Sequence, residues 1–332
     1  MASRKPLKVA LVRSPPPNWP LPLHNKNWQG VHINLAQTIN AGIALIEKAS
    51  ADGANLIAFP ELWFPGFPKG RDRNDWSKSH LASYIDNSLV VGSPDWDRII
   101  DAAKANAIWT AVAFSEKMHN RIYMAQALIS PEGEVVIHRH KLRPSGSERD
   151  MFSDGSIDGF KVVNLPIGRT GMLECGEHWY PSMTFPMQAQ REQLHIGCWP
   201  YALDPEDKAD NVWFNSHIVR HATSLYALLS GAYVLMPCVR HAFILDPLCN
   251  IVAEMRADVS FEEQPILYHV IEGFDWLDGV KEHDPDAQVS WAVLQQLQAS
   301  FPKYIPHEQG GLVPRREVSI DDLKAGRFTW SE

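Results

Sequence analysis

A cysteine at the end of an apolar segment is the first residue of this chain that could do covalent chemistry. Cys175 follows the predicted strand TGMLE (170–174) and precedes Pro181, a residue suited to the first turn of a helix. A strand end that opens toward a helix N-terminus exposes its side chain and offers backbone N–H groups to an anion. The position therefore predicts a nucleophile, although a free cysteine taken alone is more often a buried structural residue.

Two charged residues follow other apolar segments in the same way. Glu61 stands among aromatic residues and prolines in FPELWFPGFP (59–68), where loss of water would raise the pKa of a carboxyl group into the range of a general base. Lys141 in HRHKLRP (138–144) stands at the end of a predicted strand, and a second carboxylate, Glu148, follows seven residues later. Each residue alone fits a helix cap, a surface charge or a solvated strand edge equally well.

The three segments together resemble the Glu-Lys-Cys triad of the nitrilase superfamily of carbon–nitrogen hydrolases. Glu61 in FPELWFPGFP, Lys141 in HRHKLRPSGSER and Cys175 in GRTGMLECGEHWYP stand in that family's order and spacing, and the likeness covers roughly residues 7–240. It implies that the Cys175 thiolate attacks an electrophilic carbon and that Glu61 acts as general base and acid. Lys141 would stabilise charge on the tetrahedral species, and Glu148 would lie near Lys141 and the substrate nitrogen.

The residues after the cysteine bear on the substrate. Nitrilases proper carry Cys-Trp-Glu-His or Cys-Trp-Glu-Asn, and this chain has Cys175-Gly176-Glu177-His178, so Gly176 replaces the usual Trp. The resemblance favours hydrolysis of an organic nitrile to the carboxylic acid and ammonia through a cysteine thioimidate and thioester, with an amide as by-product where thiolate is expelled. The alternatives are an amidase or carbamoylase on the same scaffold, and a non-catalytic scaffold or filament protein.

Aromatic residues flank these motifs and indicate an apolar or aromatic substrate group. The expected substrate-binding residues are Trp63, Gly176, His178, Trp179 and Trp199. The aromatic members of this set would serve equally well in a core or an interface.

Metal or cofactor chemistry is not expected from the sequence. His138 and His140 alternate along one predicted strand without an obvious carboxylate companion, so no metal site is predicted there. Thiol chemistry of this kind also requires no cofactor.

The elements that must position these residues alternate between strands and helices, which predicts an α/β fold in which helices cover a sheet. Strands are expected near residues 8–12, 55–59, 109–114, 122–129, 135–140, 171–174, 194–198, 233–237, 242–245 and 251–254. Helices are expected near 33–51, 94–107, after 181, 212–229 and 287–299. The resemblance sharpens this to the nitrilase-type four-layer α-β-β-α sandwich.

Residues 281–332 are rich in charge, Pro and Gly, which predicts an extended C-terminal tail. The resemblance assigns the preceding residues 1–280 to a carbon–nitrogen hydrolase domain. We expect the tail to pack on a partner at an oligomer interface or on the outside of the domain. The resemblance implies a homodimer or a larger homo-oligomer, with a spiral among the alternatives.

The composition narrows the environment and the partners. A net charge of −8 supplies no broad basic field for nucleic acid or anionic lipid, and 45% hydrophobic residues are enough for a core. The longest uncharged stretch, residues 222–239, contains Ser, Thr, Gly and Pro and is not expected to span a membrane. Four scattered cysteines and an N-terminus without an apolar signal predict a cytoplasmic protein. The resemblance implies that its partner is a small-molecule nitrile.

Overall fold

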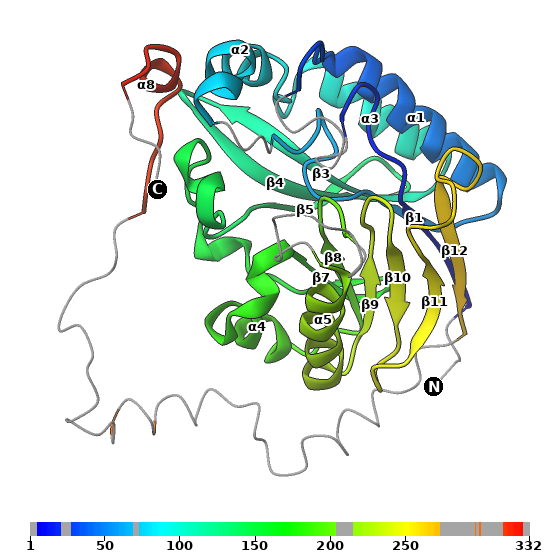
Figure 1. Ribbon diagram of the computed structural model, residues 1–332. Helices are drawn as coiled ribbons and strands as arrows, with labels where there is room; N and C mark the ends of the chain where they lie inside the picture. The colour runs from blue at the N-terminus through cyan, green and yellow to red at the C-terminus, as the bar shows by residue number, and fades with distance from the viewer. Residues whose placement is uncertain are drawn as a thin grey trace.

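Two six-stranded sheets stacked face to face form the centre of the molecule, and helices cover their outer sides (Figure 1). A computed structural model describes residues 5–20, 28–68, 73–203, 215–272 and 315–327, together with positions 296 and 299. Helices α1 (Leu35–Ala51) and α3 (Pro94–Ala105) lie over one sheet, and α4 (Pro181–Gln188) and α5 (Ser216–Ser230) lie over the other. The predicted α-β-β-α sandwich is confirmed.

The first sheet has the strand order β12-β1-β2-β3-β4-β5. Its strands are β1 (Leu7–Val12), β2 (Leu56–Ala58), β3 (Trp109–Met118), β4 (Arg121–Ile129), β5 (Val135–His140) and β12 (Ile266–Ile271). Strands β1, β2 and β3 run parallel, whereas β4, β5 and β12 pair antiparallel with their neighbours. The C-terminal ends of β2 and β5 therefore lie at the same end of the sheet.

The second sheet has the order β11-β10-β9-β8-β7-β6. Its strands are β6 (Val163–Leu165), β7 (Gly168–Glu174), β8 (Leu194–Cys198), β9 (Tyr233–Met236), β10 (Ala242–Leu245) and β11 (Ile251–Met255). Strands β7, β8 and β9 are parallel, so the segments that follow β7 and β8 leave the sheet at one end.

The remaining described elements are short or lie at the rim. They are α2 (Arg73–Asp86), α8 (Ile320–Lys324) and three 3-10 helices, η1 (Gly146–Asp150), η2 (Ile157–Gly159) and η3 (Cys175–Trp179). None of the helices in the described ranges combines the length and apolarity needed to cross a bilayer.

Sequence periodicity explains the layers. Along β5 the buried Ile137 belongs to the core between the sheets, and Val136 packs against the same cluster. On α1 the buried residues Leu35, Ile39 and Ile46 repeat at helical spacing, and Asn34 caps the helix by accepting a hydrogen bond from the Gln37 N–H. Alternation of two in strands and of 3.6 in helices thus directs apolar surface into the two interfaces.

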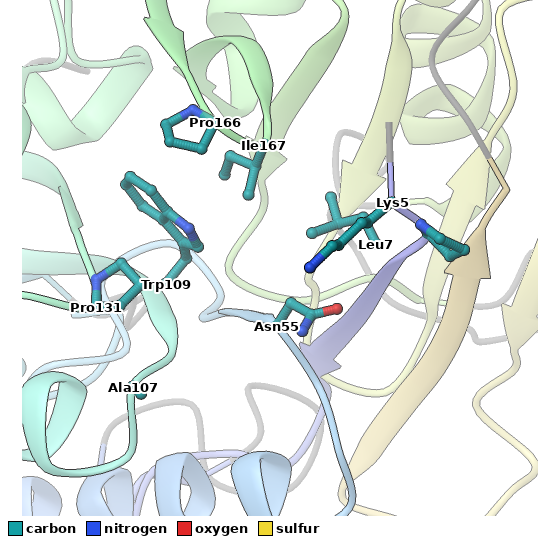
Figure 2. A pocket seen from close by; sticks show the side chains of 9 residues that line it. Lys5, Leu7, Asn55, Ala107, Trp109, Pro131, Pro166 and Ile167 are labelled. Carbon is teal, nitrogen blue, oxygen red and sulfur yellow. The ribbon is translucent and has the colours of Figure 1, made fainter. Parts of the chain in front are cut away.

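The two ends of the sandwich differ in character. A surface cavity of about 380 Å³ lies at the N-terminal ends of β1 and β3, and Leu7, Trp109 and Ile167 are among its mainly apolar lining residues (Figure 2). Glu61, by contrast, follows the C-terminal end of β2. The cavity is therefore remote from the predicted triad, since catalytic residues of parallel strands gather at their carboxyl ends.

One segment of the predicted tail, residues 315–327, packs on the chain's own domain. Val318, Ile320 and Leu323 are buried in the same core cluster as Cys175, and α8 contacts α2. The Ile320 N–H donates to the Asn120 carbonyl in the turn between β3 and β4. The expected helix at 287–299 and the start of the expected helix at 212 lie outside the described residues, apart from positions 296 and 299.

Candidate active site

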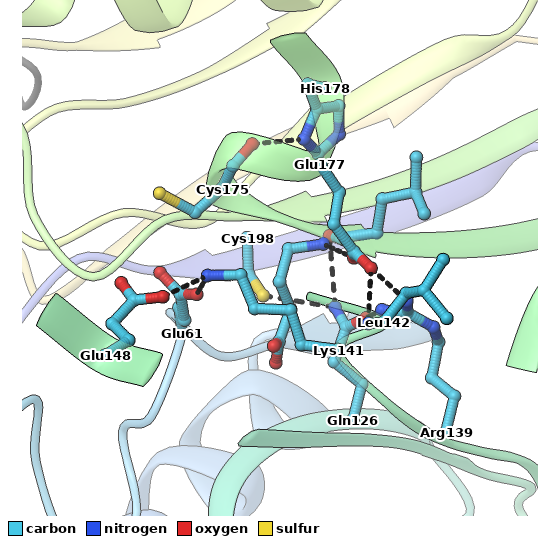
Figure 3. Close-up of polar contacts among 12 residues, drawn as sticks. Glu61, Gln126, Arg139, Lys141, Leu142, Glu148, Cys175, Glu177, His178 and Cys198 are labelled. Carbon is cyan, nitrogen blue, oxygen red and sulfur yellow. Dashed lines mark hydrogen bonds and ion pairs between the residues drawn. The ribbon is translucent and has the colours of Figure 1, made fainter. Parts of the chain in front are cut away.

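A buried ammonium joins two carboxylates where the strands end. Lys141 Nζ donates to Glu61 Oε1 at 2.7 Å and to Glu148 Oε2 at 2.8 Å (Figure 3). Lys141 and Glu61 are each 1% exposed and Glu148 is 9% exposed. Contacts between opposite charges in so little water are strong enough to fix all three side chains in place.

The predicted nucleophile stands beside this group. Cys175 is the first residue of η3, directly after β7, and its φ of +43° places a non-glycine residue in the left-handed region. Such backbone strain persists only where surrounding contacts hold it, and it turns the side chain out of the strand. In Figure 3 the Cys175 sulfur lies on the same side of the turn as Glu61, Lys141 and Glu148.

Mutual electrostatics links the thiol to Lys141. Burial lowers the pKa of Lys141, but the charges of Glu148, Glu61 and Cys175 outweigh burial and hold this pKa well above its usual value. Lys141 is thus a permanent cation, and by the same attraction it favours the thiolate form of Cys175.

Glu61 is placed to carry a proton near neutral pH. Burial raises the pKa of Glu61 to about 7, against the opposing effect of Lys141. Its Oε1 accepts from Lys141, and its buried Oε2 has no hydrogen-bond partner within the described part of the chain. One oxygen of this carboxylate is therefore held while the other remains available to a reacting group.

Glu177 ties the Lys141 strand to the Cys175 strand. Its Oε1 accepts from Arg139 at 2.7 Å and from the Leu142 N–H at 2.9 Å, and its Oε2 accepts from the Glu174 N–H at 2.9 Å. The Arg139 and Glu177 side chains are 1% and 0% exposed. One carboxylate thereby sets the spacing between the residue after Lys141 and the residue before Cys175.

His178 holds the turn from the other side. A carbonyl oxygen can only accept, so His178 Nδ1 donates to the Cys175 carbonyl at 2.9 Å. Burial, reinforced by the neighbouring His195, holds the pKa of His178 well below its usual value, so the ring is neutral. Its Nε2 therefore accepts from His195 Nε2 at 3.0 Å.

The chain of contacts continues away from the turn. His195 Nδ1 contacts Glu192 Oε2 at 2.9 Å, and the Tyr226 hydroxyl donates to the same oxygen at 2.7 Å. Two glycines make the room: a Cβ on Gly171 would lie 1.7 Å from Glu192 Oε1, and one on Gly197 would lie 2.7 Å from His178 Nε2. Any side chain at either position would displace this buried network.

The predicted substrate-binding residues divide into two groups. Trp199 packs on the His178 ring with centroids 4.7 Å apart, Trp179 lies 6.4 Å from Trp199, and a Cβ on Gly176 would meet the Trp179 ring at 3.3 Å. Gly176, His178, Trp179 and Trp199 are thus gathered around Cys175. Trp63 instead lies in the helix-side core and donates its Nε1 proton to the Ser14 carbonyl, so we assign it to packing.

Sequence reasoning missed several residues that support this site. Arg139, His195, Glu192 and Tyr226 were not singled out, and Glu177 served only as a marker of the family branch. A polar residue inside an otherwise apolar strand, such as His195 in β8, could have indicated these residues. Glu174 was missed as well: burial, and then the Glu61 charge, hold the pKa of this carboxyl well above its usual value.

Comparisons with known proteins agree with this geometry. A family model described as carbon-nitrogen hydrolase matches residues 8–263. The chain is 37% identical over 221 residues to a cyanide hydratase of Alternaria brassicicola, covering 64% of this chain and 59% of that protein. It is 34% identical over 206 residues to an arylacetonitrilase of Aspergillus kawachii, covering 62% and 63%. It is 33% identical over 259 residues to a nitrilase of Pseudomonas syringae pv. syringae, covering 74% and 70%.

The first two matches therefore span less than two thirds of those relatives' lengths. Among solved structures, an amidase of the nitrilase superfamily from Nesterenkonia AN1 matches with a TM-score of 0.62 and 15% identity, covering 88% of this chain and 97% of the amidase. At that identity the likeness concerns the fold alone. The family model covers most of the chain, and the chain therefore belongs to the carbon–nitrogen hydrolase family.

Proposed function

We propose that this protein is a nitrilase that hydrolyses an organic nitrile to the carboxylic acid and ammonia. The observation that carries the proposal is the buried Lys141, held by Glu61 and Glu148 beside the strained turn at Cys175. Relatives that are named nitrilase, arylacetonitrilase and cyanide hydratase support the nitrile as substrate class.

The first half of the reaction forms a thioimidate. The Cys175 sulfur attacks the nitrile carbon, one C–N π bond breaks, and its electron pair becomes an N–H bond with the proton that Glu61 took from the thiol. Lys141 stabilises the negative charge that develops on nitrogen, and the Gly176 backbone N–H offers a further donor.

The second half releases both products. Glu61 removes a proton from water, the hydroxide adds to the thioimidate carbon, and the protonated nitrogen leaves as ammonia to give a thioester. A second water then cleaves the thioester to the acid and regenerates the thiol. Where the tetrahedral species expels Cys175 before ammonia, the product is an amide.

The side chains around the thiol favour an apolar substrate group. Trp179 and Trp199 lie beside the turn, and Trp199 is fully buried against His178. Flat apolar surfaces of this kind match aryl or arylalkyl groups.

Replacing the nucleophile tests the proposal most directly. Cys175→Ala should abolish ammonia release from an arylacetonitrile without changing the circular dichroism spectrum. Cys249→Ala is the matched control, since Cys249 lies in the turn between β10 and β11 and donates to the Ser224 carbonyl. Full activity of the Cys175 variant would refute the assignment of the nucleophile.

An amidase or carbamoylase on the same residues is the rival. Parallel assays with an arylacetonitrile, hydrogen cyanide, the matching amide and an N-carbamoyl compound separate the two. Turnover of the amide or the carbamoyl compound alone would end the nitrilase proposal.

The pH dependence of kcat/KM tests Glu61 as the base. Because the folded-state pKa of Glu61 is raised to about 7, protonation of this carboxyl on acidification removes the base. We expect kcat/KM to fall as the pH drops through about 7. A profile that stays flat between about pH 5 and pH 9 would exclude Glu61 as the group that must be ionised.

We also propose that the chain forms a homodimer or a larger homo-oligomer in the cytoplasm. Leu225 and Leu229 lie four residues apart on α5 and are 58% and 47% exposed, which is the pattern of a helix face covered by a partner. No disulfide joins the four cysteines, a state that a reducing compartment maintains. The double variant Leu225→Asp/Leu229→Asp should have a lower sedimentation coefficient than the parent. An unchanged sedimentation coefficient would exclude this face as an interface.

A further inference from the structure

Two histidines and a carboxylate converge on the face of β5 that turns away from the active site. His138 Nε2 lies 2.7 Å and His140 Nε2 lies 2.8 Å from the same oxygen, Glu116 Oε2. One ligand atom from each of the three residues lies within 4.8 Å of the others. Glu116 is the carboxylate companion that the sequence did not reveal.

The register of the sheet brings the three residues together. On β5, His138 and His140 share one face, while Arg139 and the following Lys141 point toward the other sheet. Strand β4 lies between β3 and β5, and it places Ala127 opposite His138 and Ala125 opposite His140. Glu116 of β3 pairs with Tyr123 of β4, whose ring stacks on His140, and the small side chains of Ala125 and Ala127 leave room for Glu116 to reach across β4.

We propose that Glu116, His138 and His140 form a binding site for a divalent transition-metal ion of the zinc type. Two imidazole nitrogens and one carboxylate oxygen make the ligand set that Zn²⁺ accepts with a further position open to water. Side-chain exposures of 32% for His138, 14% for His140 and 2% for Glu116 leave one side of the cluster open to solvent and one side buried. Ions that prefer oxygen ligands, such as Mg²⁺ and Ca²⁺, do not fit two imidazoles.

Binding of a metal ion requires each histidine ring to change its tautomer. Without metal, each neutral imidazole can donate its Nε2 proton to the Glu116 carboxylate. With metal, each ring carries its proton at Nδ1 and presents the Nε2 lone pair to the ion, so neutral rings release no proton. The carboxylate must move outward by about half an ångström to leave metal–ligand bonds near 2.0–2.1 Å.

The proposed metal site and the catalytic residues lie on opposite faces of the sheet. Lys141 directly follows His140 in the chain, but its side chain lies on the opposite face. An ion held here would connect β3 to β5 across β4 and stabilise the strand that carries Lys141. The expected consequence is greater stability, and the proposal stands independently of the nitrile substrate.

Titration calorimetry on the full chain tests the site. The Cys175→Ala background removes the active-site thiol as a metal ligand, and Zn²⁺ and Co²⁺ are titrated as chloride salts. We expect a metal-binding event that His140→Ala, and separately Glu116→Gln, weaken by about 100-fold or more, since loss of even an outer partner costs about 10–100-fold. Mg²⁺ should give no heat at this site.

Two further measurements decide between this site and others. His217 and His221 lie four residues apart on α5 and are exposed, so His217→Ala/His221→Ala is the matched control and should leave the binding event intact. Zn²⁺ should raise the Tm of the parent and not that of His138→Ala, whose side chain is 32% exposed. Equal Zn²⁺ and Co²⁺ affinity in the parent, His140→Ala and Glu116→Gln, or loss of binding in the α5 control instead, would overturn the proposal.

Discussion

Glu177 and His178 are neighbours in one turn, yet they support it in opposite directions and by different means. Glu177 is a buried carboxylate that accepts from Arg139 and from two backbone N–H groups, that of Leu142 just after β5 and that of Glu174 at the end of β7. His178 is a neutral ring that donates to the Cys175 carbonyl and accepts from His195. The first support sets the distance between the Lys141 and Cys175 strands, and the second sets the orientation of the peptide at Cys175.

Because of this difference, Glu177 should contribute mainly to the stability of the fold and His178 mainly to the position of Cys175. A buried ion pair is costly to break because the remaining charge stays uncompensated, whereas a neutral hydrogen bond is worth much less. Loss of Glu177 should therefore act on the whole fold, while loss of His178 should act mainly on the strained residue Cys175.

Removal of the Glu177 carboxylate is the largest expected effect. Glu177→Ala leaves the Arg139 guanidinium buried without its ion-pair partner and should lower the free energy of unfolding by about 3–5 kcal/mol. Urea denaturation followed by circular dichroism measures the change.

The matched variant is Glu177→Gln, which keeps the shape and one acceptor oxygen. We expect a loss of about 1.5–3 kcal/mol, since hydrogen bonds to charged groups contribute that much. If the Ala variant unfolds at the same urea concentration as the parent, the distinction between the two supports is wrong.

Removal of the His178 ring is the second effect. His178→Ala takes a hydrogen bond from the Cys175 carbonyl and leaves His195 without its acceptor, which should cost about 1–3 kcal/mol of stability. Because a small displacement of a nucleophile is expensive, kcat should fall by about 10- to 100-fold with little change in KM.

The conservative variant distinguishes positioning from packing. In His178→Asn the side-chain amide retains an N–H that can reach the Cys175 carbonyl, so part of kcat should return although the ring is gone. Equal kcat in the Ala and Asn variants would mean that the ring acts through its volume and not through this hydrogen bond.

Much of the scaffold was predictable because its local patterns agree with the fold. The strands predicted at 135–140, 194–198 and 242–245 have those limits in the structure, since each is an apolar or alternating run between turn residues. Helix α2 was missed because its buried Trp76, Leu81 and Tyr84 are diluted by polar residues. Strand β6 has three residues and depends on pairing with β7.

The positions of the site residues in the sequence were predictable, but most of their contacts in space were not. Glu61, Lys141 and Cys175 each follow a strand, and the structure brings the first two within 2.7 Å of each other. Contacts that depend on strand register could not be predicted from the sequence. The contacts of Glu116 with His138 and His140 across β4 are an example. Trp63 shows the converse, because closeness to Glu61 in sequence does not keep it on the same side of the sheet.

Gly176 lies between Cys175 and Glu177 in the same turn, and its replacement gives the smallest expected effect. It faces neither support: a Cβ here would lie 2.6 Å from Ser145 Oγ, and the Ser145 N–H donates to Glu148 Oε2 at 2.6 Å. Gly176→Ala should therefore push on the Lys141–Glu148 side, with a stability loss of about 1 kcal/mol because a hydroxyl can turn away. We expect kcat/KM for an arylacetonitrile to fall by several-fold, and Gly176→Ala/Ser145→Gly should restore it. If the double variant is no better than the single one, the Trp179 ring and not Ser145 limits the space beside Cys175.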